Sequence, residues 1–168
     1  LLTAIPNWTG RLPLRGRRLM FLVSLWIVGR ICVSFSAQIG WLEAMLVDCS
    51  FLFLIAAAAA REIIAGQKWS NLGIVLLVLV LFVGNLSFHL EAHLKGAAEF
   101  SIRIGIAVVV LLISLIGGRI IPSFTRNWLV KENPGRLPVS FGRFDMLTIA
   151  VGAIALMFWI AWPSGTGT

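Results

Sequence analysis

The chain has 168 residues, of which 59% are hydrophobic and 12% charged, and its formal net charge is +7 at pH 7. A soluble domain of this length would carry about twice that charged fraction, so the composition excludes an ordinary soluble protein. The positive charge does not indicate a nucleic-acid partner, because no soluble module is present to use it. The sequence predicts an all-α, polytopic transmembrane helical bundle whose principal partner is the lipid bilayer.

Apolar runs of spanning length predict about five transmembrane helices within one transmembrane domain that covers residues 1–168. The expected spans are residues 19–37, 41–60, 72–90, 100–121 and 146–162. Short connections between them favour antiparallel neighbours. The chain has no initiator methionine, and its first residues resemble the last turn of a helix. We therefore expect a fragment of a longer polytopic protein, with the remaining helices of that protein as further partners.

Lysine and arginine are distributed unevenly between the two ends of these spans. The lead before residue 19, the boundary at residues 61–70 and the segment 117–145 hold four, two and five of the 14 basic residues. The opposite ends have only Lys95 and Arg103. Because basic residues concentrate on the cytoplasmic side of membrane proteins, we expect the start of the chain and the 117–145 loop in the cytoplasm.

The segment 117–127 has an unusual composition for the end of a membrane span. The glycine pair at its start allows another backbone to approach closely. Pro122 cannot donate a backbone hydrogen bond and tends to end or kink the helix before it. Arg119 and Arg126 lie where a span would meet water. We therefore expect a cationic corner at a membrane face, followed by a basic loop over residues 122–145.

Besides Glu43 near the start of the second expected span, two charged residues fall inside the first two expected spans, and intramembrane charges are functional candidates by default. Arg30 and Asp48 each lie about 7–10 residues from the turn shared by their helices, hence roughly 10–15 Å below it. Matching depth makes an ion pair feasible. Such a pair is either a structural clamp between two helices or a polar wall beside a cofactor or proton path, with Glu43 as the outer relay.

The two histidines of the chain, His89 and His93, are four residues apart. If the helix continues through Glu91, both project from one face, with the intramembrane Asn85 one turn below. Imidazole suits copper or haem iron, so the pair is a candidate metal site. The alternative is two interfacial histidines bonded to water or to a neighbouring helix.

Other chemistry-bearing patterns are weak. Cys49 and Met45 are four residues apart, and Cys32 lies at similar depth on the preceding helix. Sulfur ligands favour Cu(I), but cysteine and methionine are also common buried fillers. No phosphate-binding glycine loop, nucleophile elbow or zinc motif occurs, so we predict no catalytic residue.

Three stretches together resemble the NnrS family, and they occur in that family's order. They are LLTAIPNWTGR at residues 1–11, WIVGR at residues 26–30 and GGRIIPSFTRN at residues 117–127. The motif residues are Asn7, Trp8, Thr9, Gly10, Arg11, Gly117, Gly118, Arg119, Pro122, Thr125, Arg126 and Asn127. Members of this family are polytopic bacterial inner-membrane proteins associated with nitric oxide metabolism and nitrosative stress, and they are described as containing haem and copper.

The resemblance implies haem and copper as cofactors and a multi-pass location in the bacterial inner membrane. It makes His89 and Arg30 candidates for cofactor binding, with Arg30 able to pair with a haem propionate instead of Asp48. His89 and His93 remain the candidate metal ligands. The family's His-Glu-Met stretch and its later histidines are not in this sequence. We therefore expect the main ligands to be missing and haem binding by this segment alone to be weak.

The residues do not distinguish an enzyme from a sensor or a metal-handling factor. Two alternatives lie outside the resemblance. One is a fragment of a secondary transporter, for which a broken span at Gly84 and Asn85 would be typical. The other is a membrane scaffold without a cofactor, whose polar residues only lock helices together.

Overall fold

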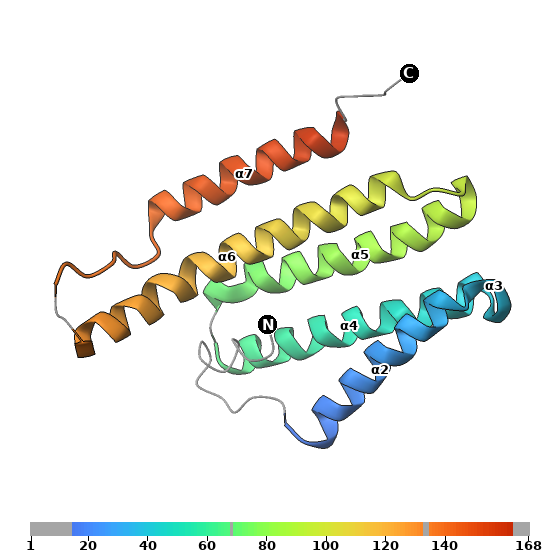
Figure 1. Ribbon diagram of the computed structural model, residues 1–168, viewed down its shortest axis with the longest axis horizontal. Coiled ribbons are helices and arrows are strands. Elements are labelled where there is room, and N and C mark those ends of the chain that lie inside the picture. The colour runs from blue at the N-terminus through green and yellow to red at the C-terminus, as the bar shows by residue number, and fades with distance from the viewer. Residues whose placement is uncertain (1–14, 68, 133–134, 163–168) are drawn as a thin grey trace. The chain divides into compact units, whose positions relative to one another are not determined.

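The computed structural model describes residues 15–67, 69–132 and 135–162, and within these ranges it is helical and contains no strand (Figure 1). The elements are α2 (Arg17–Ser34), α3 (Ser36–Ile39), α4 (Trp41–Ala65), the 3-10 turn η1 (Trp69–Asn71), α5 (Leu72–Lys95), α6 (Glu99–Glu132) and α7 (Arg143–Ala161). In this part of the chain, α4, α5, α6 and α7 are long and apolar enough to cross a membrane. The predicted all-α membrane fold is confirmed.

The first expected span corresponds to α2, which is shorter and more basic than the others. It has 18 residues, includes three arginines and ends at Ser34. The expected span 19–37 therefore ends early, because the chain turns through α3 before α4 begins. Gly40 precedes α4 with a φ of 115°, a conformation that favours glycine.

The chain forms two compact units, Leu1–Gly105 and Ile106–Thr168, with the boundary inside α6. In the first unit, α4 packs against both α2 and α5, and α3 packs against α4. Between α4 and α5, Ala59, Ile63 and Val75 form a buried apolar cluster. Small side chains such as Ala59 let helix backbones approach closely, which is the usual basis of helix association in lipid.

The end of α6 contradicts two expectations. The helix continues through the segment 117–127 and through Pro122 to Glu132. The expected cationic corner is therefore helical, and the expected loop 122–145 shrinks to the connection between Glu132 and Arg143. Pro122 removes one backbone hydrogen bond, but the intact turns on either side hold the helix, as is common in membrane helices.

In the second unit, the connection before α7 packs onto α6 through Phe141. A Cβ atom added at Gly118 would lie 3.3 Å from the Phe141 ring, so glycine makes room for this ring. The Arg119 guanidinium carbon lies 5.2 Å from the centroid of the same ring, within cation–π range. At the start of α7, the Gly142 N–H donates a hydrogen bond of 2.8 Å to Asp145.

Candidate functional site

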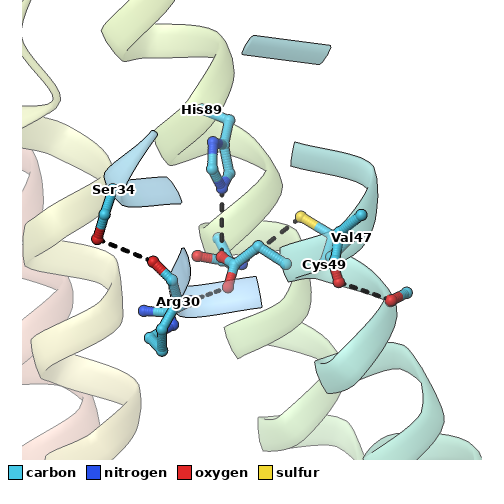
Figure 2. A network of polar contacts seen from close by, with 8 residues as sticks. Arg30, Ser34, Val47, Cys49 and His89 are labelled. Carbon is cyan, nitrogen blue, oxygen red and sulfur yellow. Dashed lines mark hydrogen bonds and ion pairs between the residues drawn. The ribbon is translucent and has the colours of Figure 1, made fainter. Parts of the chain in front are cut away.

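A buried carboxylate, that of Asp48 on α4, joins three helices of the first unit. Figure 2 labels two residues that interact with it, Arg30 and His89. Its side chain is 5% exposed and forms an ion pair with Arg30 of α2. From α5, the Asn85 amide donates to Asp48 Oδ2 at 2.7 Å, and His89 Nε2 lies 3.2 Å from the same oxygen. The ion pair expected from matching depths is present, and Asn85 and His89 join it. We call Arg30, Asp48, Asn85 and His89 the Asp48 cluster.

The local sequence explains why these side chains meet. Gly29 precedes Arg30, and a Cβ atom added there would lie 3.3 Å from both Asp48 Cα and Asp48 Oδ1. The missing side chain therefore lets α2 approach α4 at this level. Asn85 and His89 are four residues apart on an unbroken helix, so they share a face.

Of the sulfur-bearing residues, Cys49 contacts the Asp48 cluster. Cys49 is buried beside Asp48, and its sulfur lies 3.5 Å from the Asn85 amide nitrogen. Met45 is also buried on α4. Cys32 on α2 is half-buried, and both thiols are free. The Cu(I) hypothesis remains a prediction.

A cavity of about 290 Å³ adjoins the Asp48 cluster. Arg30, Asp48 and Asn85 contribute polar groups to its lining, while Trp26, Phe51 and Phe88 contribute aromatic surface. The Arg30 side chain is 52% exposed although it is paired with Asp48. An apolar cavity with a few convergent polar groups is the common form of a small-ligand site. The arrangement is able to bind an anionic or polar group on the Arg30 side.

The two histidines have different neighbours. The helix does continue through Glu91, as one shared face requires. The His89 side chain is 9% exposed and faces Asp48. The His93 ring instead stacks on Trp41, with centroids 4.0 Å apart and planes inclined by 13°. Within the described ranges, no group of three His, Cys, Asp or Glu residues is placed to hold a metal ion. Joint metal ligation by His89 and His93 remains a prediction.

Sequence reasoning missed a second polar contact, at the junction of α5 and α6. The Glu91 carboxylate accepts hydrogen bonds from the Ser101 backbone N–H, at 3.0 Å, and from the Ser101 hydroxyl. Ser101 lies in the first turn of α6, where backbone N–H groups have no partner within the helix. Glu91 therefore caps the next helix, and a carboxylate there is also favoured by the helix dipole. The sequence signal that could have predicted this cap is an acidic residue, Glu91, a few residues before the start of α6.

The remaining predicted residues are placed as follows. Glu43, the proposed outer relay, is exposed in the first turn of α4. The motif residues Asn7, Trp8, Thr9, Gly10 and Arg11 lie outside the described residues. The motif residues Gly117, Gly118, Arg119, Pro122, Thr125, Arg126 and Asn127 all lie on α6. Gly118 and Arg119 have a visible role there, because both contact Phe141.

Comparison with known proteins points to one family. The family described as NnrS protein matches residues 1–167, which is nearly the whole chain. Searches of curated proteins and of solved structures gave no match. The family match covers the Asp48 cluster, its cavity and the glycine–arginine segment of α6. The chain belongs to the NnrS family.

Proposed function

We propose that this protein acts in the bacterial inner membrane in nitric oxide metabolism or the relief of nitrosative stress, through a haem- and copper-linked site. Family membership supports the biological role. The observation that carries the proposal for this chain is the Asp48 cluster, a charged network inside apolar helices and beside a cavity. Ionisable residues within membrane helices are retained mainly where they pair, bind or transfer charge.

The residues fit one part of a haem environment. Arg30 has an exposed side chain on the cavity wall, and guanidinium is well suited to pair with a carboxylate such as a propionate. The contact between His89 Nε2 and Asp48 has the form of the carboxylate–imidazole pairs that orient metal-bound histidines. Such a pairing would leave Nδ1 to hold a metal ion, and His89 itself does not line the cavity. Bound haem iron or copper would supply ligand binding and one-electron chemistry.

The residues do not fit a complete copper centre by themselves. The described helices bring only one imidazole to the Asp48 cluster, since His93 is stacked on Trp41. Cys49 contacts Asn85, and no set of three donors converges nearby within the described ranges. The roles that this chain's own residues take in the proposal are therefore to orient His89, to hold a negative group at Arg30 and to exclude water with aromatic side chains.

A second function is favoured by one observation. A single carboxylate on α4 that interacts with groups from α2 and α5 is an effective helix clamp, which agrees with the scaffold alternative. The transporter alternative has less support, because α5 runs unbroken through Gly84 and Asn85. Substitution of Arg30 separates the two functions, because a role in haem binding predicts a changed haem spectrum whereas a role as a clamp alone predicts only lower stability.

The test is the protein purified from its native membrane, compared with Arg30→Gln, His89→Ala and the exposed control Glu99→Gln. We expect a haem absorption band and copper in the full-length protein without substitutions and in the control. We expect an altered band or lower haem content in Arg30→Gln and His89→Ala. Cells that carry the parent protein should also grow better under a nitric oxide donor than cells without it.

Two results would contradict the proposal. One is a colourless, metal-free protein whose loss does not alter growth under the nitric oxide donor. The other is an Arg30→Gln protein with an unchanged spectrum but a lower unfolding temperature, which would assign Arg30 to the clamp alone.

A further inference from the structure

A second cavity lies between α2 and α4, away from the Asp48 cluster. It has a volume of about 450 Å³ and is lined by Arg17, Arg18, Phe21, Leu22, Leu54, Ala57, Ala58 and Arg61. All of these residues belong to the first unit. Figure 1 shows α2 (blue) diverging from α4 (teal) toward the start of α2. We call this cavity the arginine groove.

Charge is concentrated at one end of the arginine groove. Arg17 and Arg18 are the first two residues of α2, and Arg61 lies in the last turns of α4. Because α2 and α4 are joined by the short α3 turn and pack together, these ends lie at the same level. All three arginines are exposed, and no acidic residue lines the groove. Its mouth therefore has a strong preference for an anion.

Below the arginines, the groove is apolar. Leu22 lies one turn below Arg18, and Leu54 lies seven residues from Arg61, so the apolar wall extends about 10 Å along the helices. Ala57 and Ala58 have small side chains on this wall, which leaves room for an acyl chain between the helices. A cationic mouth above an apolar slot matches an amphiphile with an anionic head and a hydrocarbon tail.

We propose that the arginine groove binds one anionic phospholipid, with its phosphate at Arg17, Arg18 and Arg61 and one acyl chain against Leu54, Ala57 and Ala58. Basic pockets between membrane helices are established sites for anionic lipid head groups. Arginine offers several N–H donors in a geometry that matches phosphate oxygens. The positive-inside pattern of the sequence would place this mouth at the cytoplasmic leaflet, where anionic lipids attract basic segments.

This inference is independent of the proposed haem- and copper-linked function. The groove shares no lining residue with the cavity at the Asp48 cluster. Loss of lipid binding would leave the haem proposal standing, and a metal-free protein would leave the lipid proposal standing.

The test is native mass spectrometry of the full chain in detergent, with phosphatidylglycerol or phosphatidylcholine of identical acyl chains. We expect one tightly bound phosphatidylglycerol and a clear preference over phosphatidylcholine. The triple variant Arg17→Gln, Arg18→Gln, Arg61→Gln should lose roughly tenfold or more of that preference, since each basic residue near an anionic surface contributes several-fold.

A matched control removes the same charge from the other unit. The triple variant Arg126→Gln, Lys131→Gln, Arg136→Gln should keep the preference for phosphatidylglycerol, because none of these residues lines the groove. If the groove variant keeps its preference for phosphatidylglycerol, the three arginines do not form the site and the proposal is wrong. If the control loses as much preference as the groove variant, the lipid is held by general charge attraction and the proposal is also wrong.

The groove itself is tested by Ala57→Phe, a change at an exposed position that fills the apolar wall and leaves the arginines intact. We expect this variant to lose the bound phosphatidylglycerol while glycerol phosphate, which has no acyl chain, still binds weakly. If glycerol phosphate competes with phosphatidylglycerol at equal concentration, the site is a phosphate site and the lipid proposal is wrong. If Ala57→Phe binds phosphatidylglycerol as tightly as the protein without this substitution, the proposed position of the acyl chain is wrong.

Discussion

Asp48 is a buried carboxylate that interacts with three side chains of neighbouring helices. Its oxygens serve Arg30, Asn85 and His89, which come from two different helices. A buried charge is costly without partners, so removing the carboxylate leaves three polar groups facing each other without an acceptor. At the residue scale, this makes Asp48 the position with the largest expected effect.

We expect Asp48→Ala to lower the free energy of unfolding in detergent by about 2–3 kcal/mol, less than for a fully buried pair because Arg30 is half exposed. Thermal unfolding followed by circular dichroism provides the measurement. Glu99→Gln serves as the control, since the Glu99–Arg103 pair is exposed and contributes less than about 0.5 kcal/mol. Equal unfolding temperatures for the two variants would contradict the clamp.

Gly29 is the second decisive residue, because it sets the spacing of α2 and α4 beside Asp48. Gly29→Ala should destabilise the protein by about 1–3 kcal/mol, as overpacking does in close-packed interiors. Gly152→Ala on α7 is the matched control, since nothing lies within 4 Å of its added Cβ. We expect the control to be neutral or to gain up to about 1 kcal/mol from the better helix former. A thermal unfolding comparison in which Gly29→Ala is as stable as the control would refute close packing here.

The sequence predicted half of the Asp48 cluster. Equal depth on adjacent helices was sufficient to pair Arg30 with Asp48, because depth follows from residue spacing alone. It was insufficient to direct His89 toward Asp48, since α5 is apolar around most of its circumference and its rotation depends on packing against α4. The stacking of His93 on Trp41 was unpredictable for the same reason.

At the scale of elements, the length of α6 is the most informative feature. Its 34 residues measure about 51 Å, whereas the hydrocarbon core of a bilayer is about 30 Å thick. Part of this helix must therefore lie outside the hydrocarbon region or the helix must tilt strongly. The basic and polar residues after Gly118 identify the protruding part.

Cysteine labelling tests this division of α6. In a background of Cys32→Ser and Cys49→Ala, we expect Trp128→Cys to react with a water-soluble maleimide in inverted membrane vesicles. Ile113→Cys, in the middle of the apolar run, should react at least tenfold more slowly because thiolate does not form in hydrocarbon. Similar rates at the two positions would show that the apolar run is not buried in lipid.

The glycine pair at the end of that run offers an internal control. Gly118→Leu should displace the Phe141 ring, whereas at Gly117 an added Cβ meets only Ile121 of the same helix, at 3.7 Å. We expect Gly118→Leu to speed trypsin cleavage after Arg136 several-fold and Gly117→Leu to leave it unchanged, because cleavage requires local opening. Equal cleavage rates would indicate that Phe141 does not hold the connection.

Hydropathy predicted each long helix but placed the helix ends less well, and the largest error is at the end of α6. Apolar runs mark the helices because backbone groups in lipid must bond internally. Pro122 was expected to end α6, yet a single missing hydrogen bond is too small a penalty to stop a long helix with good formers after it. Apart from Pro122 itself, the residues around it include no turn motif that would end the helix.

At the scale of the whole molecule, the two proposed sites occupy opposite ends of the first unit. Asp48 lies seven residues from the start of α4, while Arg61 lies four residues from its end. The distribution of basic residues would place the arginine groove at the cytoplasmic side and the Asp48 cluster toward the outer side. The placement of the arginine groove at the cytoplasmic leaflet depends on this orientation.

The most direct test is therefore the side of the membrane that each connection faces. The assay uses a protein without the native cysteines, in cells whose outer membrane is permeabilised and whose inner membrane is intact. We expect Ala97→Cys, between α5 and α6, to react there with an impermeant maleimide. Leu137→Cys, between α6 and α7, should react only after the inner membrane is permeabilised. Labelling of Leu137→Cys in intact cells with protection of Ala97→Cys would contradict the orientation, and labelling of both on one side would contradict the crossing of the membrane by α6.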